Sequence, residues 1–598
     1  MTEERQSLDL AMIGNCCISA LIDSHGRIVW GCFPRFDGDP VFHSLLGTPK
    51  GGTDGGIFEV TLEDLRATRQ SYIENTAVVR TILDGATGSI EIIDFAPRFK
   101  WRERSFRPQM LVRRIRPLSG SPRICIRMKP RCDYGRTAPS VSTGSNHIRY
   151  ISECLSLRLT TDAPTDYIVG EVPFILDAPI DLILGPDETL SGGVAETARD
   201  FEERTIDYWR DWVHRLALPV EWQEAVIRAA VTLKMCSYEP TGAIVAAMTS
   251  SIPEAANSGR NWDYRFCWIR DAFFVVRALN SLAAVRTMEH YFRWLINVVA
   301  ASSDGHIQPV YGIGLEARLD ERVISELPGY RGMGPVRAGN QAFVQHQHDT
   351  YGNIILGGSQ AFFDKRLYMS AGEKEFERLE TIGERAYHLY DKPDAGIWEL
   401  RTRMRPHTSS AVMSWAGCDR LAKIADHLGL APRAVLWRER ANEIRTTVFA
   451  RSWSKTRQAF VESFDGTHLD ASVLLMSEVG MVEPSDPRFI ATVERIEQVL
   501  GRGPFMMRYE EADDFGAPET AFNVCAFWRL DALARIGRKD EAREIFQALL
   551  DARNPIGLMS EDTDAKTGEA WGNFPQTYSM VGIINGATRL SKSWEATV

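Results

Sequence analysis

The spacing of apolar residues changes near residue 221, and this change constrains the fold more than any other feature. Before it, short runs rich in β-branched and aromatic residues recur between turn-forming sequences, at 28–30, 57–62, 89–95 and 167–176. Many short strands at this spacing predict a β-sandwich. The chain has 598 residues, more than one hydrophobic core supports, so at least two domains are expected.

After the change, apolar residues recur three and four apart, which is the helical period. This pattern covers residues 221–236, 373–390, 431–450, 488–500 and 520–553. Within the last segment, Gly537 predicts a tight turn between two antiparallel helices. Repeated helical hairpins with Trp- and Gly-rich loops predict a closed barrel whose chemistry lies on the loops of one rim. A helical solenoid is the alternative, and the long irregular loops fit it poorly.

These patterns predict three parts. Residues 1–196 form the β-sandwich domain, a charged helical linker covers 197–220, and a helical catalytic domain covers 221–598. The fold class is therefore a multi-domain β + α protein.

Charge and cysteine content limit the partners. The formal net charge of −10 argues against nucleic acid and anionic membranes, because both require clustered Lys and Arg. The short basic stretch 113–116 is interpreted as a solvated strand face. The start, MTEERQSLDL, does not resemble a signal peptide, and no apolar run reaches bilayer length. Ten Cys without a CxxC pair are typical of a cytoplasmic protein with reduced thiols. Assembly into a homo-oligomer is left open.

The loop GRNWDYRFCWIRDA, residues 259–272, concentrates three Arg, two Asp and four aromatic residues. Sugar hydroxyls donate and accept hydrogen bonds, so Arg and carboxylate groups beside aromatic faces are typical of a pyranose pocket. The alternative is a buried Arg–Asp network that ties loops together.

A second loop, AGNQAFVQHQHDTYG, covers residues 338–352. His346, His348 and Asp349 could be metal ligands, but residues two apart point to different sides of a helix and no further cluster completes a site. Hydrogen bonding of Gln347 and Asp349 to a sugar is the favoured interpretation.

Two further loops carry acids suited to catalysis. In DAGIWEL, residues 394–400, Glu399 adjoins Trp398, and an apolar neighbour favours the protonated form that a general acid needs. The segments GLMSEDTD and GEAWGNFPQ supply four acids that compete as the base, namely Glu561, Asp562, Asp564 and Glu569. Phosphate loops, dinucleotide fingerprints, zinc motifs and nucleophile elbows are absent from the sequence, and glycoside hydrolysis needs only two carboxylates in a sugar-shaped pocket.

At these loops the sequence resembles glycoside hydrolase family fifteen, the glucoamylase, glucodextranase and trehalase family, in its bacterial two-domain type. The resemblance runs almost end to end and rests on IGN (13–15), FPRFD (33–37), NWDYR (261–265), WIRDA (268–272), PVRAGN (335–340), QHDTYG (347–352), IWE (397–399), TAFNVCAFW (520–528), LMSE (558–561) and GNFPQ (572–576). Their order and spacing make the match specific.

The resemblance implies an N-terminal β-sandwich (a super-β-sandwich) packed on an (α/α)6 barrel. It also implies that Glu399 is the general acid, that Glu561 is the general base, and that Arg270 and Asp271 hold the nonreducing glucose. Pocket chemistry adds five candidate substrate-binding residues, which are Tyr264, Trp268, Tyr311, Gln347 and Trp398.

The expected reaction is exo-acting hydrolysis of a small α-glucoside, with release of β-glucose by inversion and with neither metal nor cofactor. The two carboxyl groups should then lie roughly 6.5–9.5 Å apart, with a water molecule between base and sugar. Trehalose is slightly favoured as the substrate, followed by malto- or isomalto-oligosaccharides. The competing functions are a disaccharide phosphorylase, which should lack the base carboxylate, and a non-catalytic glucan-binding protein.

The chain departs from the family pattern at one place. Where members often read Phe-Thr-Tyr-Ser-Lys-Val, this chain has HTSSAV at 407–412, with Ser409 and Ala411 replacing the Tyr and the Lys. The loss of an aromatic ring and a cation is expected to reshape the leaving-group side of the pocket.

Overall fold

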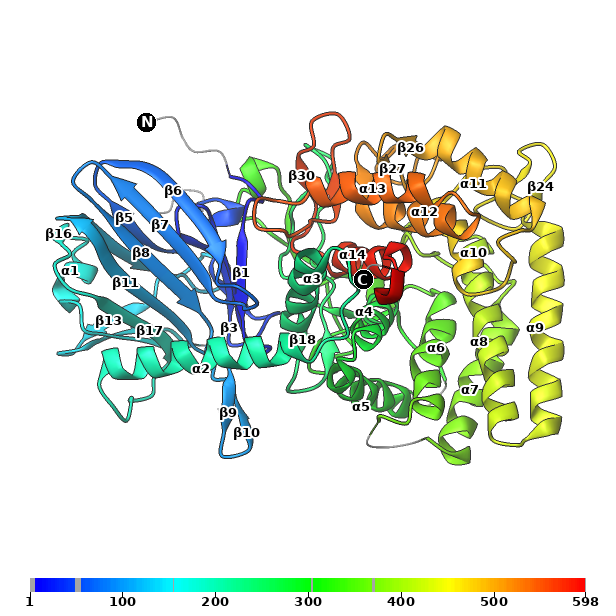
Figure 1. Ribbon diagram of the computed structural model, residues 1–598, viewed down its shortest axis with the longest axis horizontal. Helices are drawn as coiled ribbons and strands as arrows, with labels where there is room; N and C mark the ends of the chain where they lie inside the picture. Colours follow the sequence, from blue (N-terminus) through cyan, green and yellow to red (C-terminus); the bar gives the residue numbers. More distant parts are fainter. Residues whose placement is uncertain (1–5, 49–54, 154, 303–304, 368–370, 597–598) are drawn as a thin grey trace.

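The computed structural model describes residues 6–48, 55–153, 155–302, 305–367 and 371–596, and shows a β-sheet domain beside a larger helical domain (Figure 1). The first five residues of the segment MTEERQSLDL, and Cys154, therefore lie outside the described residues. Among the described helices, none is both long and apolar enough to cross a membrane.

The N-terminal domain consists of two antiparallel sheets. One has the order β1 (Ala11–Gly14), β2 (Ser19–Ile22), β3 (Ile28–Phe33), β5 (Ile57–Leu62), β12 (Arg123–Lys129) and β16 (Phe174–Ile175), with β4 (Asp39–Phe42) paired to β3. The other has the order β13 (Ser140–Thr143), β14 (His147–Ile151), β15 (Ser156–Thr161), β17 (Ile180–Pro186), β11 (Leu111–Gly120), β8 (Gly88–Phe95), β7 (Val79–Gly85) and β6 (Leu65–Tyr72). Strand β12 alternates strictly, so that Ile124, Ile126 and Met128 enter the shared core. The predicted β-sandwich is confirmed.

One predicted strand is wrong. The segment 167–176 begins inside the helix α1 (Thr165–Val169), and only the two residues of β16 at its far end are extended. Short apolar runs do not distinguish helix from strand by periodicity.

The interpretation of 113–116 as a solvated face is also wrong for its first two residues. Arg113 is 1% exposed and its Nε lies 2.7 Å from Asp94 on β8, whereas Nε of Arg114 lies 2.6 Å from Asp181 on β17. The sheet places an acid on each neighbouring strand, and the two charges are buried as pairs.

The helical domain is a double ring, which confirms the closed barrel over the solenoid. Within the described residues, the inner ring consists of α4 (Ile269–Ser281), α6 (Asp349–Phe363), α8 (Thr408–His427), the short α10 (Leu475–Glu478), α12 (Asn523–Arg535) and α14 (Thr577–Leu590), and α14 closes onto α4. The outer helices are α3 (Gln223–Met235), α5 (Val285–Ala301), α7 (Glu373–Leu389), α9 (Ala431–Arg451), α11 (Pro487–Leu500) and α13 (Lys539–Asp551).

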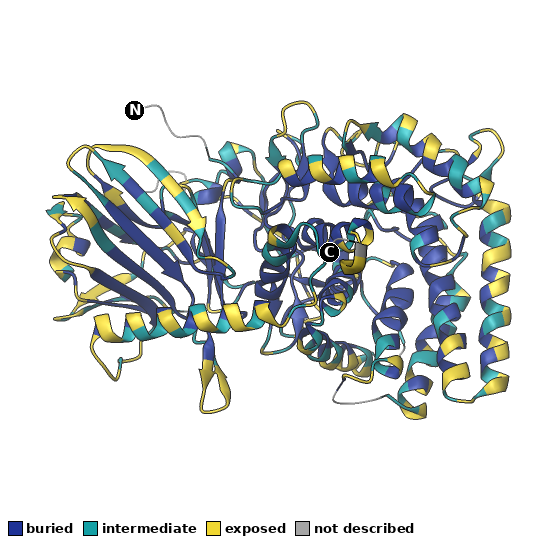
Figure 2. Ribbon diagram, in the orientation of Figure 1, coloured by how far each residue is buried: buried dark blue, intermediate teal, exposed yellow. Residues whose placement is uncertain are grey.

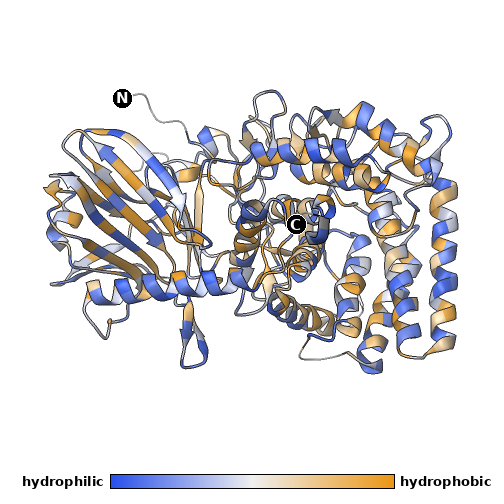
Figure 3. Cartoon of the chain, viewed as in Figure 1, coloured by the Kyte–Doolittle hydropathy of each residue, from blue (hydrophilic) through white to orange (hydrophobic). Residues whose placement is uncertain are grey.

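The amphipathic pattern of the helices explains this arrangement. Figure 2 shows the inner helices buried and α9 with an exposed outer side, and Figure 3 shows a largely hydrophilic α2 (Val194–His214) along the sandwich.

The turn between α12 and α13 contains Gly537 at a φ of +96°, a conformation that glycine adopts without strain, as predicted. The predicted domain limits at residues 196 and 220 remain predictions.

The two domains meet through buried polar contacts. Arg98 Nη2 lies 2.6 Å from Oε1 of Glu239, which also pairs with Lys234. Arg265 of the barrel donates to the carbonyl oxygen of Gly38 at 2.8 Å and to the hydroxyl of Tyr134 at 2.8 Å. The sandwich thus packs directly against the segment that contains the first predicted loop.

Candidate active site

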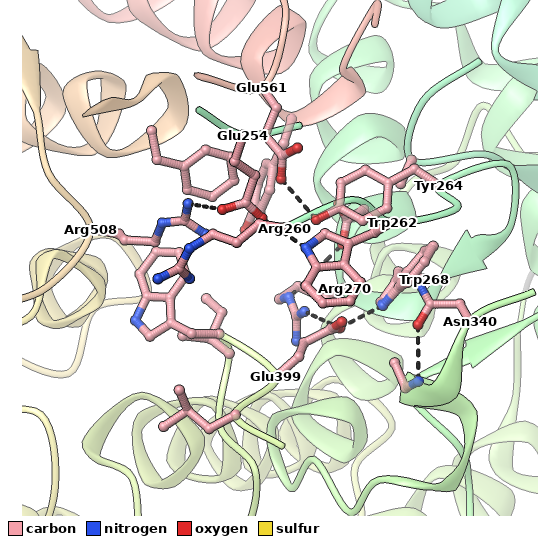
Figure 4. Close-up of a pocket in the computed structure, with 18 of the residues that line it drawn as sticks. Glu254, Arg260, Trp262, Tyr264, Trp268, Arg270, Asn340, Glu399, Arg508 and Glu561 are labelled. Carbon is pink, nitrogen blue, oxygen red and sulfur yellow. Dashed lines mark hydrogen bonds and ion pairs between the residues drawn. The ribbon is translucent and has the colours of Figure 1, made fainter. Parts of the chain in front are cut away.

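One pocket at a rim of the helical ring collects residues from loops far apart in the sequence (Figure 4). Seven of the nine predicted site residues line it: Tyr264, Trp268, Arg270, Asp271, Trp398, Glu399 and Glu561. They come from the strand β20 (Cys267–Trp268) and the loop before it, the first turn of α4, the loop before α8, and the loop before β29 (Asp562–Thr563).

Glu399 is held firmly through one of its two carboxyl oxygens. Oε1 accepts hydrogen bonds from Trp268 Nε1 at 2.6 Å, Gln347 Nε2 at 3.1 Å and Arg270 Nη2 at 3.3 Å. Its φ of +58° lies in the left-handed region, which costs a non-glycine residue about 1–2 kcal/mol. The carbonyl oxygen of Glu399 accepts a hydrogen bond from Gln345 Nε2 at 3.0 Å, which helps to hold this conformation. Because donors occupy Oε1, a proton on this carboxyl group would lie on Oε2.

Glu561 lies on the other side of the pocket (Figure 4) and is 1% exposed. The hydroxyl of Tyr264 donates to its Oε1 at 2.8 Å. Burial, followed by the nearby carboxylates of Glu254 and Asp562, raises the pKa of Glu561 well above its ordinary value. A carboxylate with a raised pKa is a stronger base toward water.

Arg270 and Asp271 form a charged pair in the pocket wall. Arg270 Nη1 donates to Gln347 Oε1 at 2.8 Å and to Asp349 Oδ2 at 3.0 Å, so both acceptors orient the guanidinium. Burial raises the pKa of Asp271 to about 6, against the opposing effect of Arg270. These groups offer the mixed donors and acceptors that sugar hydroxyls require.

Two predicted binding residues, Gln347 and Tyr311, do not line the pocket as the described residues define it. Gln347 is 2% exposed and lies behind Arg270, touching that guanidinium and Glu399, and it does not appear among the described residues that line the pocket. Tyr311, in β21 (Val310–Tyr311), pairs with β20 and packs its ring 6.1 Å from that of Trp294. Both roles in substrate binding remain predictions.

The departure at 407–412 lies beneath the pocket. Ser409 faces a small internal cavity that Arg270 and Asp349 also line, and Ala411 is fully buried in α8. Neither residue is part of the pocket wall as the described residues define it. The first turn of α8 points these side chains into the ring, and the effect of the departure on the leaving-group side remains a prediction.

Other charged and aromatic residues of the pocket wall were not predicted. They include Glu254, Arg260, Trp262, Arg508, Asp513, Phe515, Phe522, Trp528 and Tyr578. Arg260 and Trp262 belong to the first predicted loop, so the sequence motif could have identified them as pocket residues. Glu254 and Arg508 are isolated in the sequence and pair only in three dimensions.

The described residues contain no cluster of three or more His, Cys, Asp and Glu side chains arranged to hold a metal ion. The backbone N–H of His348 donates to Oδ2 of Asp394 at 2.8 Å, and Asp349 pairs with Arg270.

Comparison with known proteins gives two matching family profiles. The one described as Glycosyl hydrolases family 15 covers residues 221–588, and the one described as Trehalase-like, N-terminal covers residues 3–161. A trehalase of Thermoplasma volcanium is 31% identical over 97% of this chain and 93% of its own length. A trehalase of Mycolicibacterium smegmatis is 30% identical over 98% of this chain and 91% of its own length.

Among solved structures, a bacterial glucoamylase complexed with acarbose aligns with a TM-score of 0.69 at 12% identity. The alignment covers 99% of this chain and 94% of that one. At this identity the likeness concerns the fold, and it extends over both domains, the sandwich as well as the (α/α)6 barrel.

Proposed function

The chain belongs to glycosyl hydrolase family 15, and from this premise we propose that it hydrolyses trehalose with inversion, using Glu399 as the acid and Glu561 as the base. The observation that carries the proposal is the pair itself: two buried or half-buried carboxyl groups face one pocket from opposite sides, each fixed by hydrogen bonds from the same loop, 259–272. Curated trehalases align with nearly the whole chain, which favours trehalose over longer glucans.

In the proposed mechanism, Arg270 and Asp271 bind the hydroxyls of the glucose whose bond is broken. Glu399 delivers a proton from Oε2 to the bridging oxygen, while Oε1 stays bound by Trp268 and Gln347. Glu561 removes a proton from a water molecule that attacks the anomeric carbon from the opposite face. Tyr264, which donates to Glu561 Oε1, orients the base toward that water. Glu399 therefore has one oxygen for anchoring and one for proton transfer, whereas Glu561 accepts from Tyr264 on Oε1 and, at 3.4 Å, from the backbone N–H of Asn573 on Oε2.

Trehalose makes the stereochemistry measurable. Inverting attack converts one glucose into the β-anomer, and the leaving glucose keeps the bridging oxygen and its α-configuration. Proton NMR of the first turnovers should show equal amounts of α- and β-glucose. In water enriched in oxygen-18, the label should enter the β-anomer alone. Two α-glucose molecules would contradict inversion.

The same experiment, run on trehalose, maltose, isomaltose and soluble starch with and without phosphate, tests the alternatives. If maltose or isomaltose is hydrolysed and trehalose is not, that sugar is the substrate in place of trehalose, and the proposed mechanism still holds. If the substrate is broken down only when phosphate is present, with glucose 1-phosphate as a product, the protein is a phosphorylase. Binding of a glucan without turnover of any substrate would make it a glucan-binding protein.

We also propose that the protein is cytoplasmic. In the part of the chain that the structure describes, nine cysteines are free thiols and eight of them are buried, which is compatible with a reducing compartment. Fractionation of the source cells with an antibody to the protein tests the location, and light scattering of the purified chain tests whether it forms a homo-oligomer.

A further inference from the structure

A further carboxylate, that of Glu254, lines the pocket on the side of Glu561 (Figure 4). Glu254 is 3% exposed and lies in the loop between β19 (Ala243–Ile244) and β20. Trp262 Nε1 donates to its Oε1 at 2.9 Å, and Arg508 Nη2 pairs with its Oε2. Both partners are donors that cannot accept, so they hold the anion.

Arg508 joins Glu254 to the strand β29, which begins directly after the base. Its Nη2 lies 3.6 Å from Oδ1 of Asp562, the buried residue directly after Glu561. The hydroxyl of Thr520 lies 2.8 Å from the carbonyl oxygen of Glu254 and 3.3 Å from the same Oδ1. One arginine and one threonine thus connect Glu254 to the start of β29.

The charges around Glu561 do not balance. Near these three carboxylates, Glu254, Glu561 and Asp562, the described residues supply two guanidinium groups. Arg508 pairs with Glu254 and lies 3.6 Å from Asp562, whereas Arg260 is paired with Asp513 and also acts to lower the pKa of Asp562. Buried carboxylates without enough cations favour protonation of one of them. After burial, which is the largest cause, Glu254 and Asp562 act to raise the pKa of Glu561, whereas Arg508 and the hydrogen bond from Tyr264 act to lower it.

We propose that Glu254 is a positioning residue for the base: it anchors Arg508 against β29 and keeps a fixed negative charge beside Glu561. It does not accept the proton of the attacking water, because nitrogen donors already occupy both of its oxygens. The proposal rests on the proposed function to the extent that Glu561 is the base.

The test is the pH profile of kcat/KM for trehalose in the wild type and in Glu254→Gln. The amide keeps the size of the side chain and removes its charge. The acid limb, which reports the base of the free enzyme, should move to lower pH by about 0.5–1 unit, and kcat should fall by about 10-fold or less. KM should stay within about threefold, because the glucose-binding pair is untouched. An acid limb at the wild-type position would overturn the proposal.

Two variants guard against a purely structural explanation. Arg508→Gln removes the cation, so its acid limb should move to higher pH, opposite to that of Glu254→Gln. Glu380→Gln alters another glutamate that accepts from a tryptophan N–H, that of Trp437, and pairs with an arginine, Arg433; it lies between the outer helices α7 and α9 and should leave the pH profile unchanged. Shifts of Glu254→Gln and Arg508→Gln in the same direction would also overturn the proposal.

Azide separates this proposal from the assignment of the base. In Glu561→Ala, azide can attack the anomeric carbon as the glycosidic bond breaks and Glu399 protonates the leaving oxygen, which gives β-glucosyl azide and glucose. Rescue of Glu561→Ala without rescue of Glu254→Ala supports both assignments. Rescue of Glu254→Ala would make Glu254 the base and overturn its positioning role. Failure to rescue Glu561→Ala, with the predicted pH shift in Glu254→Gln, would count against the proposed mechanism alone.

Discussion

Arg265 of the barrel donates a hydrogen bond of 2.8 Å from Nη2 to the phenolic oxygen of Tyr134 in the β-sandwich. Arg265 is 1% exposed, forms an ion pair of 2.7 Å with Asp263, and stands in the chain between Tyr264 and Trp268. Those two neighbours hold Glu561 and Glu399, respectively. The sandwich therefore supports the segment that orients both carboxyl groups, although it contributes no residue to the pocket wall as described.

Tyr134→Phe should lower both stability and turnover. The phenyl ring leaves a buried N–H of Arg265 without its acceptor, which costs about 1–3 kcal/mol. Urea unfolding and kcat for trehalose measure the two effects. Tyr167→Phe, on an exposed ring of the same domain, is the control and should change neither. Wild-type stability and kcat in Tyr134→Phe would show that the contact has no role.

Glu399→Gln and Glu561→Gln should each lower kcat by about 10²–10⁴-fold, because each loses a positioned acid or base. Circular dichroism should show an unchanged fold. Glu569→Gln, which alters a competing acid paired with Arg331, should remain active. Full activity in either of the first two variants would remove that residue from the mechanism.

Arg270→Lys should raise KM and lower kcat together. Lysine keeps the charge but cannot donate at once to Gln347, Asp349 and Glu399 as the guanidinium does.

Gln347→Ala should lower kcat more than it raises KM, because Gln347 touches Glu399 and Arg270 behind the pocket. Steady-state kinetics on trehalose separates the two patterns. A change in KM alone for Gln347→Ala would instead support direct contact with the sugar.

The contribution of Asp394 and Asp271 to the free energy of unfolding should fall as pH rises from about 4 to above about 7, whereas four histidines whose pKa burial lowers to about 4, His43, His290, His348 and His407, contribute in the opposite direction. Burial raises the pKa of Asp394 to about 7 and that of Asp271 to about 6. A carboxyl group with a raised pKa in the folded state stabilises the fold below its unfolded pKa, and this contribution is lost as pH rises through the folded value. Asp394→Asn should therefore remove a falling contribution of a few kcal/mol between these pH values. An equally steep dependence in this variant, measured by urea unfolding, would contradict the assignment to Asp394.

Asp94→Asn should destabilise the protein by about 3–5 kcal/mol, because it leaves the Arg113 guanidinium buried without a counter-charge. Replacing both residues, as Asp94→Leu with Arg113→Met, should cost less than the single change. The midpoint of urea unfolding checks both variants. A single variant as stable as the wild type would mean that the pair is not buried in solution.

Much of the fold was predictable because its signals are local. The helical period, which depends on residues three and four apart, predicted α3, α7, α9, α11 and the pair α12 and α13. The strand predicted for 167–176 was wrong because a short apolar run is compatible with a helix as well as with a strand. For Arg113, the sequence does not indicate which strand lies beside β11, and therefore not that Asp94 would bury its charge.

The sequence by itself determined the family, the two kinds of domain and seven of the residues that line the pocket, because the loops that supply those seven contain dense motifs such as NWDYR or IWE. Only the tertiary structure placed Gln347 behind Arg270, Ser409 beneath the pocket, and Glu254 beside Arg508. Residues 254 and 508 lie on loops that meet when α14 closes the ring onto α4. A contact between such distant residues depends on ring closure, and the residues next to either of them in the sequence do not indicate it.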